Sequence, residues 1–328
     1  MSERLRVAVV GAGGWGRQHA RVFAGRPDTE LCAIVGRSVA KTAKRAAEFT
    51  TTPYTDIDQM LADQQPHLVA VCLPNEGHFE ATLQLVRTGV PLLVEKPLVF
   101  ELEQADTLLE EAMRSGSFFA INFNHRYAEP VLRARAAIEA GELGDLVFAS
   151  WRFGGEGKGT SPHANLIETQ CHGFDLLEHL CGPISSVMAQ MTSKTQGDWS
   201  TLAVALEFSN GAVGTLLGSY DSSYAYPDSH LVEINGTSGR AMIHDTVRSL
   251  TLSVVGDEME RRWQAGYFND EARSFAGTFD RHVEAVLTAL RSGREPPVHA
   301  RAGRRALELA MAVIDSHERG IRIKTPPQ

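Results

Sequence analysis

The 328-residue sequence lacks the features that mark membrane, secreted and nucleic-acid-binding proteins. No stretch approaches the roughly 20 apolar residues that a membrane helix needs, and Met1-Ser2-Glu3-Arg4 lacks the basic-then-apolar layout of a signal peptide. No long run of basic residues is present either, and the net charge is −8. Because nucleic-acid binding needs a positive patch that displaces counterions, we expect neither a nucleic-acid nor a membrane partner.

Cysteine is scarce, and the four residues Cys32, Cys72, Cys171 and Cys181 are scattered without any C-x-x-C pair. This usage is typical of buried thiols in a reducing compartment rather than of a disulfide framework, so we expect a cytoplasmic protein. The cysteines and histidines also lack the spacing of a zinc site, and we therefore expect no metal.

What is present is an ordinary globular composition, with 43% hydrophobic and 22% charged residues, in a chain long enough for two domains. In the first part, short apolar runs alternate with helical patterns, and the clearest strands span residues 5–10, 31–35, 68–73 and 92–94. Apolar strands separated by helices predict a parallel sheet covered on both faces, an α/β doubly wound Rossmann domain. Such a sheet binds ligands beyond the carboxyl ends of its strands.

The rhythm changes after about Asn124, where a helical pattern over residues 128–140 is followed by several strand-like segments. These segments span residues 202–208, 212–218, 231–234 and 240–243, and Ser209-Asn210-Gly211 is a strong hairpin signal between the first two. Helical patterns return over residues 275–292 and 301–318. We therefore predict a second, α+β domain with a largely antiparallel open sheet, and domains of residues 1–124 and 125–328.

The segment Gly11–Gly16 has the sequence GAGGWG, which matches G-x-G-x-x-G directly after an apolar strand and at the start of a helix. That context indicates a dinucleotide-binding turn. Gly11 permits the tight turn, Gly13 lets the backbone approach a pyrophosphate, and Gly16 lets helix and strand pack closely. The helix N-terminus then offers N–H groups and a partial positive charge to the phosphates.

An NAD-preferring site usually has an acidic residue about 20 positions further on, to bond the ribose 2′-hydroxyl. Here that position is Gly36, followed by Arg37 and Ser38. A guanidinium and a hydroxyl would bind a 2′-phosphate, so NADP(H) is favoured, with NAD(H) possible. The alternative is that Arg37 and Ser38 only start a solvated helix, with Ser38 as its N-cap.

Several later segments resemble the Gfo/Idh/MocA family, which includes glucose–fructose oxidoreductase and inositol dehydrogenases. The resemblance covers nearly the whole chain. It rests on P-N-x-x-H at Pro74–His78, E-K-P at Glu95–Pro97, Asn122–Tyr127, Glu168-x-x-x-His172-x-x-Asp175, Gly236–Gly239 and the last helix before Gly320.

The resemblance implies that Lys96 of E-K-P is catalytic, as a cation that stabilises a developing alkoxide. It also implies that His172 exchanges the hydroxyl proton and that Glu168 orients its imidazole. The sequence predicts that Leu166–Cys181 is a helix in which Glu168 and His172 stack on one face. Asp175 is either catalytic or an anchor for this helix. The alternatives without a catalytic role are that His172 is a structural histidine, that Glu168 is only its i,i+4 partner and that Lys96 is a surface lysine.

The expected dinucleotide site combines the glycine turn, the end of the second strand and the segments that the resemblance marks. It comprises Gly11, Gly13, Gly14, Trp15, Gly16, Gly36, Arg37, Ser38, Leu73, Pro74, Asn75, His78, Glu95, Lys96, Asn124 and Arg126.

The resemblance implies an NAD(P)-dependent oxidoreductase that transfers a hydride between nicotinamide and a hydroxyl or keto carbon of a sugar, cyclitol or related polyol. It also implies a homodimer or homotetramer assembled through the sheet of the second domain. The alternative from another class is a non-catalytic, dinucleotide-sensing regulatory protein of the same fold.

Overall fold

A computed structural model describes residues 4–157, 159, 161–194 and 199–326. The chain forms two compact units, and each is described by itself. The first contains the chain up to Phe123 together with Phe279–Arg304, and the second contains Asn124–Thr278 together with the chain from Arg305 onward.

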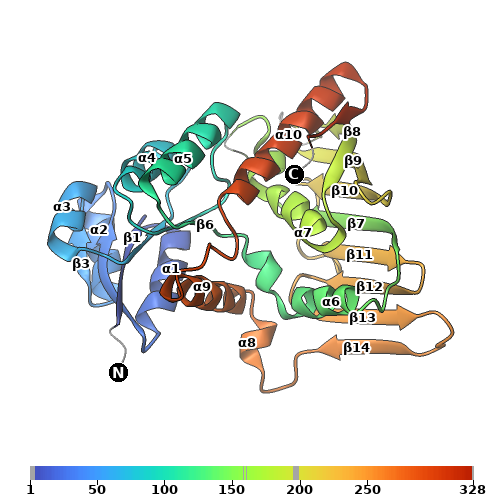
Figure 1. Cartoon of the computed structure of the whole chain (residues 1–328), viewed down its shortest axis with the longest axis horizontal. Helices are drawn as coiled ribbons and strands as arrows, with labels where there is room; N and C mark the ends of the chain where they lie inside the picture. Colours follow the sequence, from blue (N-terminus) through green and yellow to red (C-terminus); the bar gives the residue numbers. More distant parts are fainter. Residues whose placement is uncertain (1–3, 158, 160, 195–198, 327–328) are drawn as a thin grey trace. The chain divides into compact units, whose positions relative to one another are not determined.

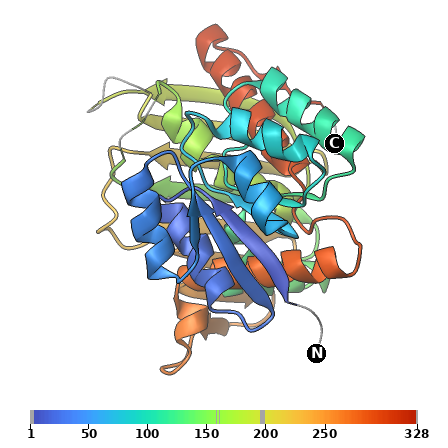
Figure 2. The same ribbon diagram turned by 90° about the vertical axis from the view of Figure 1, so that its left-hand side faces the viewer.

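The first unit is built on a six-stranded sheet in the order β3-β2-β1-β4-β5-β6, with every pair parallel. Figure 2 shows its first strands, in blue, side by side. The strands are β1 (Leu5–Val10), β2 (Thr29–Val35), β3 (Thr52–Tyr54), β4 (Leu68–Val71), β5 (Leu92–Val94) and β6 (Phe119–Ile121). The helices between them are α1 (Gly14–Ala24), α2 (Val39–Glu48), α3 (Ile57–Gln64), α4 (His78–Arg87) and α5 (Leu102–Ser115). The predicted Rossmann domain is confirmed.

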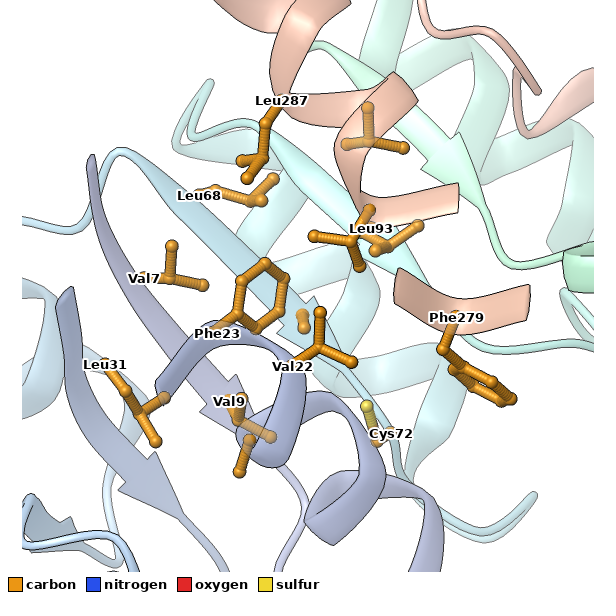
Figure 3. Close-up of a cluster of buried hydrophobic side chains, with 14 of the residues drawn as sticks. Val7, Val9, Val22, Phe23, Leu31, Leu68, Cys72, Leu93, Phe279 and Leu287 are labelled. Atoms are coloured by element: carbon orange, nitrogen blue, oxygen red, sulfur yellow. The ribbon is translucent and has the colours of Figure 1, made fainter. Parts of the chain in front are cut away.

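Helix α9 (Ala276–Arg291) brings the chain back to the first unit after Asn124–Thr278 of the second. Its apolar face is fully or almost fully buried at Phe279, Val283, Val286 and Leu287. Figure 3 shows Phe279 and Leu287 in one cluster with side chains of β1 and α1, among them Val9 and Phe23. Residues 279–304 were predicted to lie in the second domain, whereas they belong to the first unit.

The second unit contains a nine-stranded sheet in the order β14-β13-β12-β11-β7-β10-β9-β8-β15 (Figure 1). Among the strand pairs of this sheet in the described residues, only β7–β10 is parallel, so the predicted largely antiparallel sheet is confirmed. The strands are β7 (Leu146–Gly154), β8 (Ile184–Thr192), β9 (Thr201–Phe208), β10 (Val213–Ser219), β11 (His230–Gly236), β12 (Gly239–His244), β13 (Ser249–Val254), β14 (Glu260–Gln264) and β15 (Ile323–Lys324). The hairpin predicted at Ser209–Gly211 joins β9 to β10, with Gly211 at a φ of 88°.

Helices cover one face of this sheet, where α7 packs on β7 and α6 on β12 and β13 (Figure 1). The remaining elements of the unit are η1 (Asn124–Tyr127), α6 (Glu129–Glu139), η2 (Asn165–Thr169), α7 (Cys171–Cys181), α8 (Asp270–Arg273) and α10 (Arg301–Arg319), whose first turn belongs to the first unit. In the described part of the chain, no helix is both long and apolar enough to span a membrane.

The buried face of α9 predicts a large loss of stability when Leu287 is truncated. Leu287→Ala would leave a cavity in the first unit and lower the free energy of unfolding by about 2–5 kcal/mol, measured by urea denaturation. Thr288→Ala, one residue further on the exposed face of α9, is the matched control and would change it by less than about 0.5 kcal/mol. Equal losses in the two variants would contradict the packing described for α9.

Candidate active site

The predicted glycine turn has the geometry that a dinucleotide needs. Gly11 has a φ of 131°, and a Cβ added there would lie 2.3 Å from the carbonyl oxygen of Cys72. A Cβ on Gly16 would lie 1.8 Å from the Gly11 oxygen, so α1 approaches the turn too closely for any other residue. By contrast, nothing lies within 4 Å of a Cβ built on Gly13 or Gly14. The turn is therefore packed tightly from behind and open at the start of α1, where phosphates would meet its N–H groups.

The strand ends that the sequence analysis singled out lie together at the carboxyl edge of the parallel sheet. Backbone hydrogen bonds connect them in series: Gly11 N donates to Val35 O at 2.8 Å, Cys72 N to Val10 O at 2.7 Å and Glu95 N to Val71 O at 2.9 Å. This edge is where a doubly wound sheet binds its ligand.

The missing acid at Gly36 has a steric cause. A Cβ there would lie 2.6 Å from Thr42 Oγ1 and 3.2 Å from the Cβ of Ala12, so helix α2 leaves no room for a carboxylate. Thr42 Oγ1 donates to the Gly36 carbonyl oxygen at 3.1 Å. Ser38 caps α2, because its Oγ accepts a hydrogen bond from Lys41 N at 3.4 Å. This is the N-cap role that the sequence offered as the alternative to binding a 2′-phosphate. The guanidinium of Arg37 is mostly exposed and lies 3.7 Å from the exposed carboxylate of Glu76.

The segment after β4 places Leu73, Pro74 and Asn75 ahead of α4, with His78 as the first residue of that helix. His78 is buried, and its Nδ1 lies 3.3 Å from the Leu73 carbonyl oxygen. Burial lowers the pKa of His78, which keeps the ring neutral. Trp15 is half-exposed, and its indole stacks on Phe279 of α9 with ring centroids 5.7 Å apart.

Glu95 is 4% exposed and directs its carboxylate into the protein. Its Oε1 accepts from His19 Nε2 at 2.8 Å and from Asn122 Nδ2 at 2.7 Å, and His282 Nδ1 donates to Asn122 Oδ1 at 2.8 Å. Its Oε2 accepts from the backbone N–H of Lys96 at 3.2 Å. Burial raises the pKa of Glu95, but the hydrogen bond and charge of His19, the charge of Lys96 and the bond from Asn122 outweigh it, so the pKa is lowered.

Lys96 directly follows this carboxylate at the end of β5, is partly buried and precedes a cis peptide bond to Pro97. The lysine of E-K-P, which is predicted to be catalytic, thus lies at the ligand-binding edge of the sheet. A buried negative charge lies beside it.

In the second unit, Leu166–Cys181 is not one regular helix, and the sequence-based prediction was wrong here. A π-helical turn, η2, spans Asn165–Thr169, and α7 begins only at Cys171. Glu168 lies in the π turn and His172 in the first turn of α7, so the two residues do not have the i,i+4 relation of a continuous α-helix. Such π turns recur at functional sites because they re-aim side chains.

His172 is buried and belongs to a cluster of imidazole and aromatic rings. Its ring stacks on that of His125 with centroids 4.0 Å apart and planes 13° apart. His230 of β11 lies 5.7 Å from His125 and 4.3 Å from Trp151. Burial lowers the pKa of His230 to about 3, so this ring is neutral at physiological pH.

Asp175 and Arg126 form a buried ion pair. Arg126 Nε donates to Asp175 Oδ2 at 2.8 Å and its Nη2 to Oδ1 at 2.5 Å. Burial alone would lower the pKa of Arg126, but the carboxylate of Asp175 outweighs it and raises the pKa. This geometry gives Asp175 an anchoring role between α7 and η1. Asn124 also bonds within this unit, since its Nδ2 donates to Thr278 Oγ1 at 2.7 Å.

The start of α7 rests on a hydrogen-bonded support. Trp151 Nε1 donates to Gln170 Oε1 at 2.8 Å, and Gln170 Nε2 donates to Asn165 Oδ1 at 2.9 Å. Gly173, next to His172, faces the indole, because a Cβ there would lie 2.7 Å from Trp151 Nε1. Helix α7 therefore approaches β7 closely at the residue after His172.

The sequence patterns did not predict a group of buried residues with polar side-chain atoms that lie around the predicted site residues. They are His19, Asn122, His125, Trp151, Gln170, His230 and His282. Asn122 and His125 lay inside a segment that the resemblance had marked, and His19 lies three residues after Gly16. No spacing pattern pointed to the other four. The structure thus holds Lys96 with the dinucleotide-binding edge in the first unit, and His172 with its ring cluster in the second.

Comparison with known proteins assigns the family. A model described as an oxidoreductase family with an NAD-binding Rossmann fold, GFO_IDH_MocA, matches residues 5–123, and its C-terminal alpha/beta domain matches residues 135–325. The chain belongs to the Gfo/Idh/MocA oxidoreductase family. The predicted resemblance is confirmed. The prediction was an NAD(P)-dependent oxidoreductase, and the match confirms a family of oxidoreductases with an NAD-binding fold.

Two curated relatives are dehydrogenases of polyols and sugars. Inositol 2-dehydrogenase of Rhizobium meliloti (strain 1021) is 23% identical over 328 residues, which cover 95% of this chain and 96% of the relative. D-glucoside 3-dehydrogenase of Escherichia coli (strain K12) is 29% identical over 242 residues, 65% of this chain and 69% of the relative. Among solved structures, levoglucosan dehydrogenase in complex with NADH shares the fold of this chain, with a TM-score of 0.91 and 18% identity. The match covers 99% of this chain and all of that one.

The contact between Gly173 and Trp151 predicts that a glycine-to-alanine change in this helix lowers the free energy of unfolding, which is the opposite of the usual effect. Alanine normally stabilises a helix by up to about 1 kcal/mol over glycine. Gly173→Ala would instead lower the free energy of unfolding by about 1–3 kcal/mol, because the methyl group meets the indole. Gly14→Ala, in the open first turn of α1, is the control and would be neutral or stabilising in urea denaturation of the ligand-free protein. A stabilised Gly173→Ala variant would refute the close approach of α7 to β7.

Proposed function

We propose that this family member is a dehydrogenase or reductase acting on a hydroxyl or keto carbon of a sugar, cyclitol or related polyol. The observation that carries the proposal is that the chain keeps Lys96 beside a buried carboxylate at the dinucleotide-binding edge and also keeps a buried imidazole at His172. A protein that only senses a dinucleotide needs the glycine turn but neither of these groups. The curated relatives, an inositol and a glucoside dehydrogenase, support the substrate class.

The glycine turn fits a dinucleotide, since Gly13 and Gly14 leave open space at the N-terminus of α1 while Gly11 and Gly16 allow close packing behind it. When bound, a nicotinamide cofactor accepts or supplies the hydride. In the direction of oxidation, the imidazole of His172 takes the hydroxyl proton as the hydride leaves the same carbon, and in reduction it returns that proton. The ammonium of Lys96 stabilises the negative charge that develops on the substrate oxygen. Glu168 remains a candidate for orienting His172, and Asp175 supports α7 through Arg126.

The test of this function is turnover. The full chain would be assayed with NAD⁺ and NADP⁺ across a panel of hexoses, glucosides and inositols, and with the reduced cofactors across the matching ketones. Lys96→Ala and His172→Ala would each lower kcat by about 10²-fold or more, since they act on the developing charge and the proton. His172→Ala would bind the dinucleotide within about threefold of the parent. Tight dinucleotide binding without oxidation or reduction on any substrate would instead support the regulatory alternative.

We infer that NADP(H) is preferred over NAD(H). The support is that Gly36 leaves no space for the carboxylate that bonds a ribose 2′-hydroxyl, and that the exposed guanidinium of Arg37 follows it. Planar guanidinium groups bind phosphate through two parallel hydrogen bonds, which a hydroxyl cannot match.

Cofactor titrations followed by fluorescence test this preference. Arg37→Ala would weaken NADPH binding by roughly tenfold and leave NADH binding unchanged, because only the first ligand has a 2′-phosphate. Arg114→Ala, which removes an exposed arginine from the end of α5, serves as the control and would change neither. An unmodified protein that binds NADH at least about tenfold tighter than NADPH would overturn the preference.

We also infer a homodimer or homotetramer assembled through the sheet of the second unit. Supporting this, four apolar side chains of strands β7, β8 and β10 are 41–55% exposed, namely Phe148, Met188, Val213 and Leu217. Phe148 and Val213 are register partners on neighbouring strands and so lie on one face. Contiguous apolar patches of this kind mark interfaces, and a second copy of the chain is the partner with the same patch to offer.

Light scattering on purified protein tests the assembly. Val213→Lys would lower the measured mass toward that of one chain, because a charge in the apolar patch opposes its burial. Val255→Lys, at another exposed valine in the β13–β14 turn, would leave the mass unchanged. A mass of one chain for the parent at micromolar concentration would rule the assembly out.

The expected location is the cytoplasm. Its support is that Cys32, Cys72, Cys171 and Cys181 are all buried in the structure, as thiols often are in proteins of reducing compartments.

A further inference from the structure

The ring of His125 lies flat against that of His172 in the second unit. The two ring centroids are 4.0 Å apart and the ring planes 13° apart, and the residues are 4% and 7% exposed. His125 belongs to η1, whereas His172 is in the first turn of α7. The function proposed above uses only the imidazole of His172, so the ring that covers its face has no assigned role.

A histidine side chain has a torsion that its helix does not fix. Rotation about the bond between Cβ and the ring has broad minima, so the backbone position alone does not set the plane of an imidazole. Proton transfer requires that a ring nitrogen point at the substrate oxygen within hydrogen-bond distance. A flat ring against one face of the imidazole opposes this rotation, because turning would drive the imidazole edge into its neighbour. His125 provides such a face for His172.

The residues on either side of His125 anchor η1. Asn124 Nδ2 donates to Thr278 Oγ1 at 2.7 Å, and Arg126 Nε donates to Asp175 Oδ2 at 2.8 Å. Asp175 lies on α7, one turn after the imidazole that His125 contacts. The second of these bonds therefore holds η1 against the same helix that carries the imidazole, and the ring of His125 is presented from a segment that is fixed on both sides.

Further rings surround His125 and keep it in place. Those with printed contacts are Trp151, Phe153, His230 and Phe275, with centroids 6.2, 6.5, 5.7 and 5.4 Å from that of His125. The last three meet it at interplanar angles of 63–87°, which is the edge-to-face packing that aromatic rings favour. Trp151 also donates to Gln170, the residue before α7, at 2.8 Å. One indole therefore supports both the His125 ring and the start of the helix that carries His172.

We propose that His125 is the positioning residue of His172, and that its ring face fixes the plane of the imidazole that exchanges the substrate proton. The inference rests on the proposed function, because it concerns the group to which that function assigns the proton. His125 transfers no proton in this role and acts by its shape. A planar ring without nitrogen atoms therefore serves as well, and a branched aliphatic side chain does not.

Two variants separate planarity from hydrogen bonding, since both lack the ring nitrogens. His125→Leu would lower kcat roughly tenfold with the substrate KM and the dinucleotide Kd within about threefold of the parent, because a slightly misplaced catalytic group slows the chemical step. His125→Phe keeps a flat ring and would keep kcat within about threefold of the parent. Equal losses of kcat in the two variants, or no loss in either, would overturn the positioning role.

Nuclear magnetic resonance reports the stacking without turnover. Labelling with ¹³Cε1-histidine gives one signal for each of the 12 histidines, and that of His172 is assigned by its loss in His172→Ala. A proton over the face of another ring is shielded. At alkaline pH, where imidazoles are neutral, the His172 signal would lie upfield of exposed histidines in the parent and in His125→Phe, and would move downfield in His125→Leu. A His172 signal without this upfield shift in the parent would overturn the inference, whether or not the variants fold.

His317→Leu is the matched control. The ring of His317 on α10 packs edge-on against Trp199 with centroids 4.7 Å apart, and its Nδ1 accepts from Met191 N at 3.2 Å. The control thus also removes a histidine ring with an aromatic contact in the second unit. It would lower stability but leave kcat and the His172 signal in place. A fall in kcat as large as that of His125→Leu would overturn the positioning role, since any loss of packing would then have the same effect.

Two results separate this inference from the proposed function. Equal kcat in the parent and in His125→Leu, in a protein that turns over polyols, would overturn the positioning role and leave the function standing. A parent protein without turnover on any substrate would overturn the proposed function, and with it the positioning role, whatever the His172 signal shows.

Discussion

A buried carboxylate must be satisfied by donors from the protein, and in the first unit this requirement connects parts of the chain that are far apart in sequence. Glu95 follows β5, His19 belongs to the helix that the glycine turn begins, Asn122 follows β6, and His282 comes from a helix more than 150 residues later. Moving any one of these elements would leave a charge or an amide unpaired in an apolar surrounding, at a cost of about 1–3 kcal/mol for each group. The ligand-binding edge of the sheet is therefore held in place by polar contacts beneath it as well as by the apolar core.

The fold was largely predictable because its strands and helices are local patterns. Apolar runs such as Val7–Val10 and Leu68–Val71 become central strands of a parallel sheet, and the turn at Ser209–Gly211 becomes a hairpin. The partition of the chain was not predictable in the same way. Helix α9 has an apolar stripe that would suit either unit, and only its packing against Val9, Phe23 and Leu93 places it in the first. Sequence periodicity shows that a helix has a buried face, but not which surface buries it.

The candidate site was likewise predictable where it depends on local patterns and not where it depends on contacts between distant residues. The turn Gly11–Gly16, the missing acid at Gly36 and Lys96 were all found from residues close in sequence. The contact with Thr42 explains why a glycine stands at position 36. The residues that hold the segment of Lys96 in place are connected by no spacing rule. The predicted stacking of Glu168 on His172 assumed a regular helix, and the π turn at Asn165–Thr169 breaks it. That turn is stabilised by long-range bonds such as the one from Asn165 Nδ2 to the Ser200 carbonyl oxygen at 2.7 Å. Patterns within a segment could not reveal it.

The return of α9 also bears on how the protein is made. Ribosomes synthesise a chain from its N-terminus at about 5–20 residues per second, so residues 279–304 follow the strands of the first unit by on the order of ten seconds. During that interval the apolar surface around Val9, Phe23 and Leu93 has no α9 to cover it, while strands β7 to β14 of the second unit are being synthesised. The apolar core of the first unit can therefore be completed only after nearly the entire chain has emerged.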